Sequence, residues 1–371
     1  MIDFSGDKTG VKGTGDSMKK IKNILNRIFI EGLTGMAHGL FATLIIGTII
    51  QQIGTLIGGD IGDLIFQVGK VAASLTGAGI GVGVAYRFKE TPFVTLSSAA
   101  AGMVGAFASK IIAGTVLVEG SIVLAGPGEP LGAFVAAYVG IEVGRLFAGK
   151  TKLDIIITPI VTIGSGAAIG ILVGPPISKF MTALGAMINY GTEQQPLLMG
   201  IIVSVLMGMI LTLPISSAAL GVILSLSGPA AGAATIGCCC NMVGFAVASY
   251  RENKMGGLLA QGLGTSMLQV PNIMKKPIIW IPAIVSSAIL GPIGIMFFGM
   301  TNNATGSGMG SAGLVGQITT WETMMVPGNE WIVLAKIALL HFILPAIVTL
   351  LVSEFMRKMK WIKFGDMKLE L

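Results

Sequence analysis

The chain has 371 residues, of which 53% are hydrophobic and only 11% are charged, and its mean hydropathy is +0.84. Soluble domains carry about 25% charged residues, so this composition excludes an ordinary soluble protein and indicates a polytopic membrane protein. The net charge of +6 does not indicate nucleic-acid binding, because the sequence holds no soluble module with a basic, aromatic-interleaved surface.

The N-terminal residues predict a surface helix. Residues 17–30 place Met18, Ile21 and Ile28 on one helical face, with the basic side chains largely elsewhere. This pattern is typical of an amphipathic helix on an anionic membrane surface. No short apolar core with a small-residue cleavage site precedes it, so no cleavable signal peptide is expected. We expect residues 1–32 to form a cytoplasmic amphipathic arm.

The middle of the chain consists of apolar stretches long enough to cross a bilayer, which takes about 20 residues. They are 33–58, 64–86, 92–115, 131–148, 154–174, 196–214, 230–249, 277–299 and 332–354. The shorter stretch 216–228 crosses only if it is tilted or broken. With it included, the predicted fold is an all-α polytopic membrane protein of about ten transmembrane helices. The membrane domain is expected over 33–354, followed by a basic cytoplasmic tail over 355–371.

Glycine is unusually frequent along these stretches, with 54 residues in the chain. The glycines show no collagen period and lie within apolar sequence. They therefore predict close helix packing and broken helices within a membrane.

The distribution of Lys and Arg predicts the orientation. Basic residues occur in the N-terminal arm, in the C-terminal tail and at Arg87/Lys89, Arg145/Lys150/Lys152, Arg251/Lys254 and Lys275/Lys276. The loops 58–63, 118–130, 174–176 and 301–330 contain neither residue. Positive residues mark cytoplasmic loops, so both termini are expected in the cytoplasm. All the basic loops lie on the cytoplasmic side only if 256–274 enters and leaves the membrane on that side.

Two polar, glycine-rich segments are predicted to be re-entrant hairpins. The first is "GGLLAQGLGTSMLQVPN" (256–272), which is too polar for an ordinary span and has no charge typical of a cytoplasmic loop. The second is "TNNATGSGMGSAGLVGQITTW" (301–321). Non-helical backbone at membrane depth is tolerated where protein or water satisfies its polar groups. Two such elements entering from opposite faces are typical of transporters that bind solute near the midplane.

Uncharged polar side chains in these segments are the candidate solute-binding residues. The first segment holds Gln261, Thr265, Ser266, Gln269 and Asn272, at spacings that would gather several on one helical face. Further candidates are Asn241, and Asn302, Asn303 and Ser311 from the second segment. Amides and hydroxyls both donate and accept hydrogen bonds, as sugar hydroxyls do. The same groups also join neighbouring helices, and both interpretations stay open.

Placing a titratable side chain within a membrane span costs free energy, so such residues suggest a function by default. Glu142 lies three residues from Arg145, so a helix-end ion pair is expected as readily as a solute contact. The two histidines, His38 and His341, are expected to be buried hydrogen-bonding groups rather than catalytic bases. For Lys110 the sequence identifies no counter-charge.

Enzyme motifs are absent: there is no P-loop, nucleophile elbow, zinc-type histidine spacing or kinase motif. We therefore predict no catalytic residue, no metal and no cofactor in this chain. The three cysteines form one run at 238–240, which is typical of small residues inside a helix. A redox or metal role is the alternative.

One long region carries a family resemblance. The run "LPISSAALGVILSLSGPAAGAATIGCCCNMVGFAVASYRENKMGGLLAQGLGTSMLQVPNIMKKPIIWIPAIVSSAILGPIG" (213–294) resembles the stand-alone enzyme IIC-type membrane proteins of the bacterial phosphotransferase system, including the perfringolysin O regulator-like subgroup. The stretch "GSGMGSAGLVGQ" (306–317) extends the similarity.

The resemblance implies a multi-pass homodimer in the bacterial inner membrane, with re-entrant hairpins around a sugar site. In that family a separate IIB protein phosphorylates the sugar from a phosphocysteine. Related porters often carry a Gly-Ile-Thr-Glu motif whose Glu binds the sugar. Here Thr265 and Ser266 occupy the similar place without an acid, and the chain has no IIB-like domain.

The sequence is compatible with two functions. The first is a permease of the enzyme IIC type that moves a small polar solute, a sugar or sugar derivative, by rigid-body alternating access. The alternative is a membrane sensor that binds a solute and signals to a cytoplasmic partner. Membrane lipid, a second copy and a separate IIB-type phosphocarrier are the expected partners.

Overall fold

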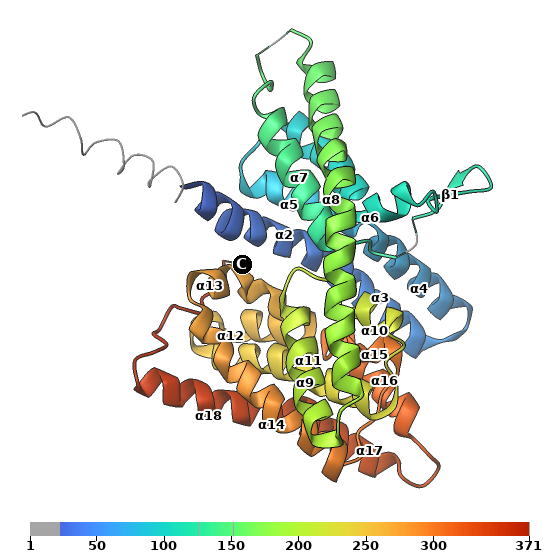
Figure 1. The fold of residues 1–371 in the computed structure, drawn as a ribbon, viewed down its shortest axis with the longest axis vertical. Helices are drawn as coiled ribbons and strands as arrows, with labels where there is room; N and C mark the ends of the chain where they lie inside the picture. Colours follow the sequence, from blue (N-terminus) through green and yellow to red (C-terminus); the bar gives the residue numbers. More distant parts are fainter. Residues whose placement is uncertain (1–22, 125, 151, 371) are drawn as a thin grey trace, which may run out of the picture.

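The computed structural model describes residues 23–124, 126–150 and 152–370, which form an all-α polytopic membrane protein (Figure 1). Residues 17–22 of the amphipathic helix expected over 17–30 lie outside the described residues. From Asn23 the chain is helical and passes residue 32 without a break.

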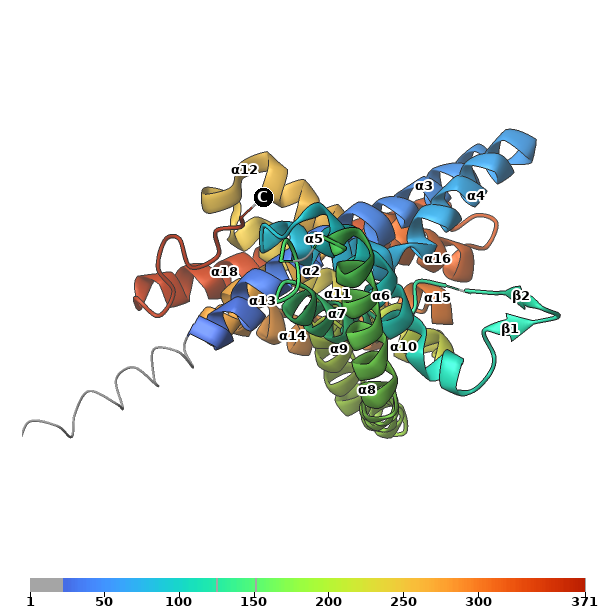
Figure 2. The same cartoon turned by 90° about the horizontal axis from the view of Figure 1, so that it is seen from above.

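The first half of the chain forms one group of helices. Its elements are η1 (Arg27–Gly32), α2 (Leu33–Leu40), η2 (Phe41–Ile45), α3 (Ile46–Ile57), α4 (Gly59–Ser74), α5 (Thr76–Arg87), α6 (Pro92–Ile112), β1 (Leu117–Val118), β2 (Ser121–Ile122), α7 (Pro130–Gly144) and α8 (Asp154–Thr192). The strands form a two-residue antiparallel ladder in the loop after α6. Figure 2 shows the α3–α4 arm and the strand hairpin projecting on the side opposite α12 and α18.

The second half forms another group around helix α11. Its elements are α9 (Pro196–Thr212), α10 (Ser217–Ile223), α11 (Gly228–Ala248), α12 (Tyr250–Leu259), η3 (Ala260–Gly264), η4 (Ser266–Gln269), α13 (Val270–Lys275), η5 (Pro277–Trp280), α14 (Ile281–Phe297), α15 (Ala304–Ser307), η6 (Ala312–Leu314), α16 (Val315–Met324), α17 (Glu330–Ile337), η7 (Ala338–Ile343) and α18 (Leu344–Lys358).

Six helices among the described residues are long and apolar enough to cross a membrane, and the α4–α5 pair, bent by 52°, would make a seventh. They are Asn23–Thr55, Pro92–Ile112, Asp154–Ile177, Gly228–Ala248, Pro277–Phe297 and Glu330–Lys358. Helices α7 and α9 are shorter, at 15 and 17 residues. With 7 residues, α10 is only about 10 Å long and does not cross alone. The total of about ten crossings stays a prediction.

The predicted loop at 174–176 is wrong, because α8 continues through Pro175 and Pro176 to Thr192. A proline removes one backbone hydrogen bond from a helix, but membrane helices tolerate this where a neighbour compensates. The hydroxyl of Ser109 on α6 donates to the carbonyl of Gly174 at 3.3 Å.

Helix α11 is the most enclosed of the spans, with 89% of its apolar window buried. Glycine allows its neighbours to approach: a Cβ on Gly237 would overlap the carbonyl of Ser204 on α9. Gly39 and Gly79 meet in the same way between α2 and α5. The close glycine packing expected from composition is confirmed at these crossings.

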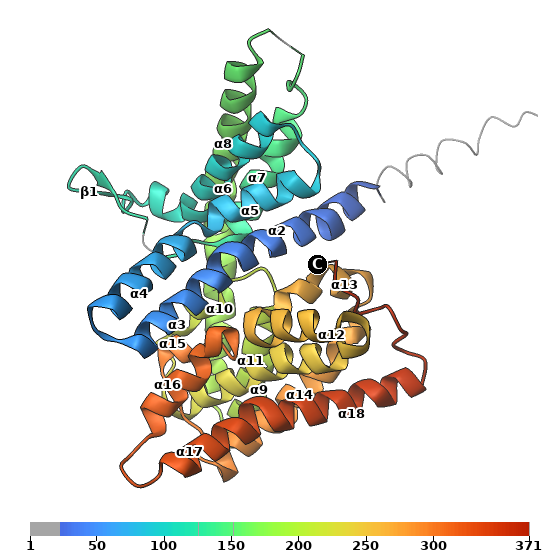
Figure 3. The ribbon, with the colours of Figure 1, turned by 180° about the vertical axis from the view of Figure 1, so that it is seen from behind.

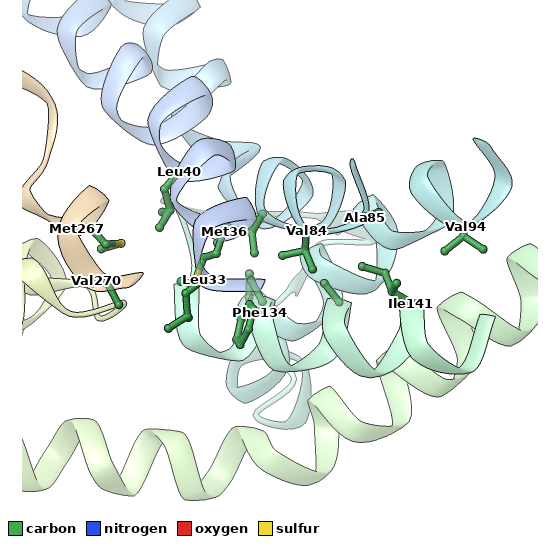
Figure 4. Packing of buried hydrophobic residues seen from close by; sticks show 14 of the residues in the cluster. Leu33, Met36, Leu40, Val84, Ala85, Val94, Phe134, Ile141, Met267 and Val270 are labelled. Carbon is green, nitrogen blue, oxygen red and sulfur yellow. The ribbon is translucent and has the colours of Figure 1, made fainter. Parts of the chain in front are cut away.

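The two groups share an apolar contact. Leu33, Met36 and Leu40 on α2 belong to one buried cluster with Met267 and Val270, which project toward them from the opposite group (Figure 4). The segment 256–274 is therefore packed directly on the first helix.

Charged side chains from distant parts of the sequence form several groups of ion pairs. Arg27 contacts Glu90 and Glu142, whereas Arg87 contacts Glu31 and Glu370. Other pairs are Lys276–Asp366, Arg251–Glu354 and Arg357–Glu252. Figure 3 shows the C-terminus, α12 and α13 on the side opposite the α3–α4 turn and the strand hairpin. These pairs use basic residues from the N-terminal arm, from three of the four predicted basic loop clusters and from the C-terminal tail.

Candidate functional site

The segment 256–274 folds as two short helical limbs that meet at Thr265. The first limb, α12 and η3, ends where Thr265 becomes extended, with φ −160° and ψ 140°. Its hydroxyl then accepts a hydrogen bond from the Met267 amide at 3.1 Å and caps the second limb. Gly264, just before the turn, lies against the Phe41 ring with no room for a Cβ. The hairpin shape agrees with the prediction, and its entry into a membrane stays a prediction.

Three carboxamides of this hairpin form a buried chain. Gln269 Nε2 donates to Gln261 Oε1 at 2.8 Å, and Asn272 Nδ2 donates to Gln269 Oε1 at 2.9 Å. Gln261 Nε2 in turn donates to the hydroxyl of Ser249 at 2.9 Å. All four side chains are buried. The structure therefore brings together the amide residues that the sequence singled out.

The carboxamide chain ends on the backbone of the C-terminal tail. Gln269 Nε2 also donates to the carbonyl of Met367 at 3.0 Å, and Asn272 Nδ2 donates to that of Lys368 at 2.9 Å. The tail, predicted as a basic cytoplasmic segment, is thus part of the polar site.

Asn241 and Ser266 meet in a second polar network next to the first. Thr212 Oγ1 contacts Ser266 Oγ at 2.8 Å and Asn241 Oδ1 at 3.2 Å. Asn241 Oδ1 also accepts from Trp280 Nε1 at 2.9 Å. Asn241 Nδ2 donates to the Ser287 hydroxyl at 3.4 Å. The network links α9, α11, the hairpin and α14.

Asn302 and Asn303 lie in a separate network that shapes the second predicted hairpin. Asn302 Nδ2 donates to Thr235 Oγ1 at 2.7 Å and to the Gly316 carbonyl at 3.1 Å. Asn303 Oδ1 caps α15 by accepting from the Gly306 amide at 3.0 Å. No hydrogen bond described for these two asparagines reaches the first hairpin.

The tips of the two segments touch. Ser311 Oγ donates to the carbonyl of Gly262 at 2.6 Å. Gly310, one residue earlier, adopts φ +52° and packs on the backbone of α11 at Cys238, where a side chain would collide. Of the second segment's candidates, Ser311 is therefore the one that contacts the first hairpin.

Glu142 has the ion pair that its spacing predicts, since Arg145 lies 2.8 Å away. Arg27 approaches the same carboxylate at 2.6 Å, and also bonds Glu90 at 3.0 Å. Burial raises the pKa of Glu90, although the hydrogen bond and charge of Arg27 oppose this. This cluster lies at a helix end, and no hydrogen bond described for it reaches the carboxamide chain. Lys110 lies 5.5 Å from the centroid of the Phe107 ring.

The histidine predictions are each half right. His341 is buried, but neither ring nitrogen has a hydrogen-bond partner among the described residues, because its helical segment packs against apolar neighbours such as Ile236 and Leu290 at Leu340. His38 has a partner, the Glu370 carbonyl at 3.0 Å, but is only partly buried. The three cysteines are buried within α11.

Several members of these networks carry no clear sequence signal. They are Thr212, Ser249, Asn253, Trp280 and Ser287. The available signal was the position of Ser249 and Asn253, which lie 12 and 8 residues before Gln261, or about three and about two helical turns. Trp280 and Ser287 come from a different helix, so only the fold brings them in.

The combined site consists of amides, hydroxyls and backbone carbonyls. Such groups both donate and accept hydrogen bonds, which suits a solute rich in hydroxyls. In this conformation the amides bond to one another and to the tail, so a solute would replace these bonds.

Comparison with known proteins gives one family match. The family model described as "Phosphotransferase system, EIIC" matches residues 30–369. A search of curated proteins gives no match.

Proposed function

The chain belongs to the EIIC family of the phosphotransferase system, and from this we propose that it is the membrane permease for a small polar solute, a sugar or sugar derivative. The observation that carries the proposal is the buried chain Gln261–Gln269–Asn272. Family membership supports the permease role, and the site chemistry supports the type of solute.

The solute class follows from the charge of the site. Buried carboxamides offer paired donors and acceptors without net charge. They match hydroxyls better than a metal cation, because none of these side chains is a carboxylate that would balance the charge of the cation. Because Thr265 and Ser266 stand where related porters carry a Glu, we infer that Gln269 and Asn272 supply the main polar contacts to the solute.

The transport movement would separate surfaces that now touch. The first hairpin packs on α2 through Met267 and Val270 and on the second segment through Ser311. Rigid-body displacement of one helix group against the other would open this contact and expose the carboxamides. We place the two predicted re-entrant segments at this interface.

The remaining parts of the proposal concern orientation and partners. The basic residues of the ion pairs described above would mark the cytoplasmic face, as the positive-inside rule expects, and both termini would then be cytoplasmic in a bacterial inner membrane. A separate IIB-type phosphocarrier would dock on this face. The functional unit would be a homodimer with two-fold symmetry.

The test is uptake of radiolabelled sugars and polyols into proteoliposomes. Gln269→Ala removes the central amide. It should lower uptake about tenfold, because a loss of about 1.4 kcal/mol in binding free energy weakens the affinity for the solute by that factor. Gln194→Ala is the matched control, because Gln194 is partly exposed and its side chain bonds the Tyr190 carbonyl, four residues earlier, at 3.0 Å. Equal uptake by both variants would remove Gln269 from the site.

A sensor is the second candidate, and the contact of the tail with the hairpin favours it. Solute binding at Gln269 and Asn272 would compete with the carbonyls of Met367 and Lys368, and would thereby signal to a cytoplasmic partner. Solute-dependent thermal stabilisation without any uptake would support the sensor over the permease.

A further inference from the structure

The C-terminal residues return to the hairpin after α18 ends at Lys358. The chain turns at Lys360 and Gly365, both with positive φ, and then crosses the base of the hairpin. We refer to residues 363–370 as the C-terminal strap. In Figures 1 and 3 the C-terminus lies beside α13 and near α2.

The strap backbone is held by side-chain amides. Asn253 donates to the Met367 carbonyl at 2.8 Å and accepts from the Leu369 amide at 2.8 Å. The Asn253 carboxamide thus donates to one backbone carbonyl and accepts from one backbone amide, as a residue of a neighbouring β-strand would. Gln269 and Asn272 supply the next two donors. Two of the three amides are thus the residues assigned above to the solute.

Two strap side chains anchor it by apolar burial. Met367 is fully buried in a cluster that includes Phe245 and Ile273. Leu369 packs with Ala37 and with Leu268 on the hairpin. The strap therefore covers the hairpin and α2 at the same time.

The acidic strap residues pair with basic residues around the site. Asp366 contacts Lys276 at 2.5 Å, and Glu370 contacts Arg87 and, at 3.9 Å, Lys275. Partial burial raises the pKa of Asp366, but the hydrogen bonds from Lys276 and the Lys363 amide outweigh this and hold it below its usual value. All these side chains are partly exposed, so each pair contributes little and can be exchanged.

We propose that the C-terminal strap is an intramolecular plug that occupies the amides of Asn253, Gln269 and Asn272 and must leave before a solute reaches them from this face. The proposal builds on the function proposed above, because the plugged amides are the solute-binding ones. Its weak outer ion pairs make it releasable, and an anionic partner would compete with Asp366 and Glu370 for Lys275, Lys276 and Arg87.

The test measures strap release through a cysteine at Leu268→Cys, which lies beneath Leu369. The native cysteines are buried, so a membrane-impermeant maleimide should label the intact protein slowly. In Lys276→Asp, labelling should be about fivefold faster, because losing an ion pair worth about 1 kcal/mol shifts the release equilibrium by about that factor. The charge swap Lys276→Asp with Asp366→Lys should restore slow labelling.

A truncation after residue 362 should label completely. Met207→Cys is the control reporter, because it is fully buried in a different cluster and should stay unlabelled unless the whole fold opens. Slow labelling at position 268 in a truncated protein whose control stays sealed would overturn the plug. Failure of the charge swap to restore slow labelling would overturn the role of the Lys276–Asp366 pair.

Uptake by the same truncated protein separates this inference from the proposed function. Faster labelling with faster uptake supports both. Faster labelling without uptake of any solute supports a cover over the amides and refutes the permease. Unchanged labelling with normal uptake refutes the plug and keeps the permease.

Discussion

The hydroxyl of Ser311 donates to the carbonyl of Gly262 at 2.6 Å, and this bond joins the tips of two segments that lie 49 residues apart. Both residues are buried. The hairpin is thus bonded to the second segment through Gly262 and to residues 363–370 through Gln269 and Asn272.

Ser311→Ala should destabilise the protein by about 1 kcal/mol, because the Gly262 carbonyl would lose a buried donor. The measurement is thermal unfolding in detergent. Ser74→Ala is the matched control, since the exposed Ser74 hydroxyl bonds the Val71 carbonyl within its own helix. Equal unfolding temperatures for the two variants would show that the tip contact contributes nothing.

Gly237→Ala should destabilise by about 1–3 kcal/mol through overpacking, since the new Cβ would collide with the Ser204 carbonyl. Alanine favours a helix over glycine by roughly 0.5–1 kcal/mol, which does not offset the collision. Gly256→Ala is the control, because a Cβ there meets nothing within 4 Å. If Gly237→Ala unfolds at the parent's temperature or above, the close α9–α11 packing is refuted.

Glu252→Gln should destabilise by about 3 kcal/mol, because Arg357 would lose its nearest carboxylate in a buried pair. The Glu252 side chain is 0% exposed and that of Arg357 is 10% exposed, at a distance of 2.9 Å. Arg251→Gln is the comparison, because the Arg251–Glu354 pair is far more exposed and its loss should cost less than about 1 kcal/mol. Denaturation of both variants in one detergent ranks them, and a reversed order contradicts the prediction.

Stability should fall as pH rises through the titration of Glu129. Burial raises the pKa of this carboxyl from 4.5 to about 7, against a weaker effect of the Leu131 amide. The folded state therefore binds the proton more tightly than the unfolded state. The contribution of the protonated Glu129 to the free energy of unfolding is fully present below about pH 4.5 and is lost between about pH 4.5 and 7. It amounts to at most roughly 3 kcal/mol.

The measurement for Glu129 compares thermal unfolding at pH 5 and pH 8 with that of Glu129→Gln, which cannot titrate. Relative to the parent, the variant should unfold at a higher temperature at pH 8 than at pH 5, because the parent carries a buried charge at pH 8. A parent-to-variant difference that is the same at both pH values would contradict the shifted pKa.

The sequence predicted the helical class and the positions of the six long apolar helices, because apolar length is a local property. It also located the break near Thr265, since glycine and polar residues interrupt the apolar pattern there. The loop expected at Pro175 and Pro176 was wrong, because proline is a weaker helix breaker inside a membrane than in water.

The site was predictable only in part. Gln261, Gln269 and Asn272 lie close in sequence, so helical spacing could group them. Their partners at Met367 and Lys368 are backbone carbonyls about 100 residues away, and any residue type presents a carbonyl. No pattern of side chains could therefore have indicated that the tail completes the network.

Helix α8 has a mechanical consequence for any movement of the two helix groups. Its first part packs on α6 and α7, where Gly166 meets Ala101 and the backbone at Ala136, and its last turns pack on α9, where Gly191 meets Ile202. A single 39-residue rod is thus embedded in both groups. Any movement of one group against the other would therefore have to bend α8, and the Pro175–Pro176 step, which lacks backbone donors, is where the helix would bend most easily.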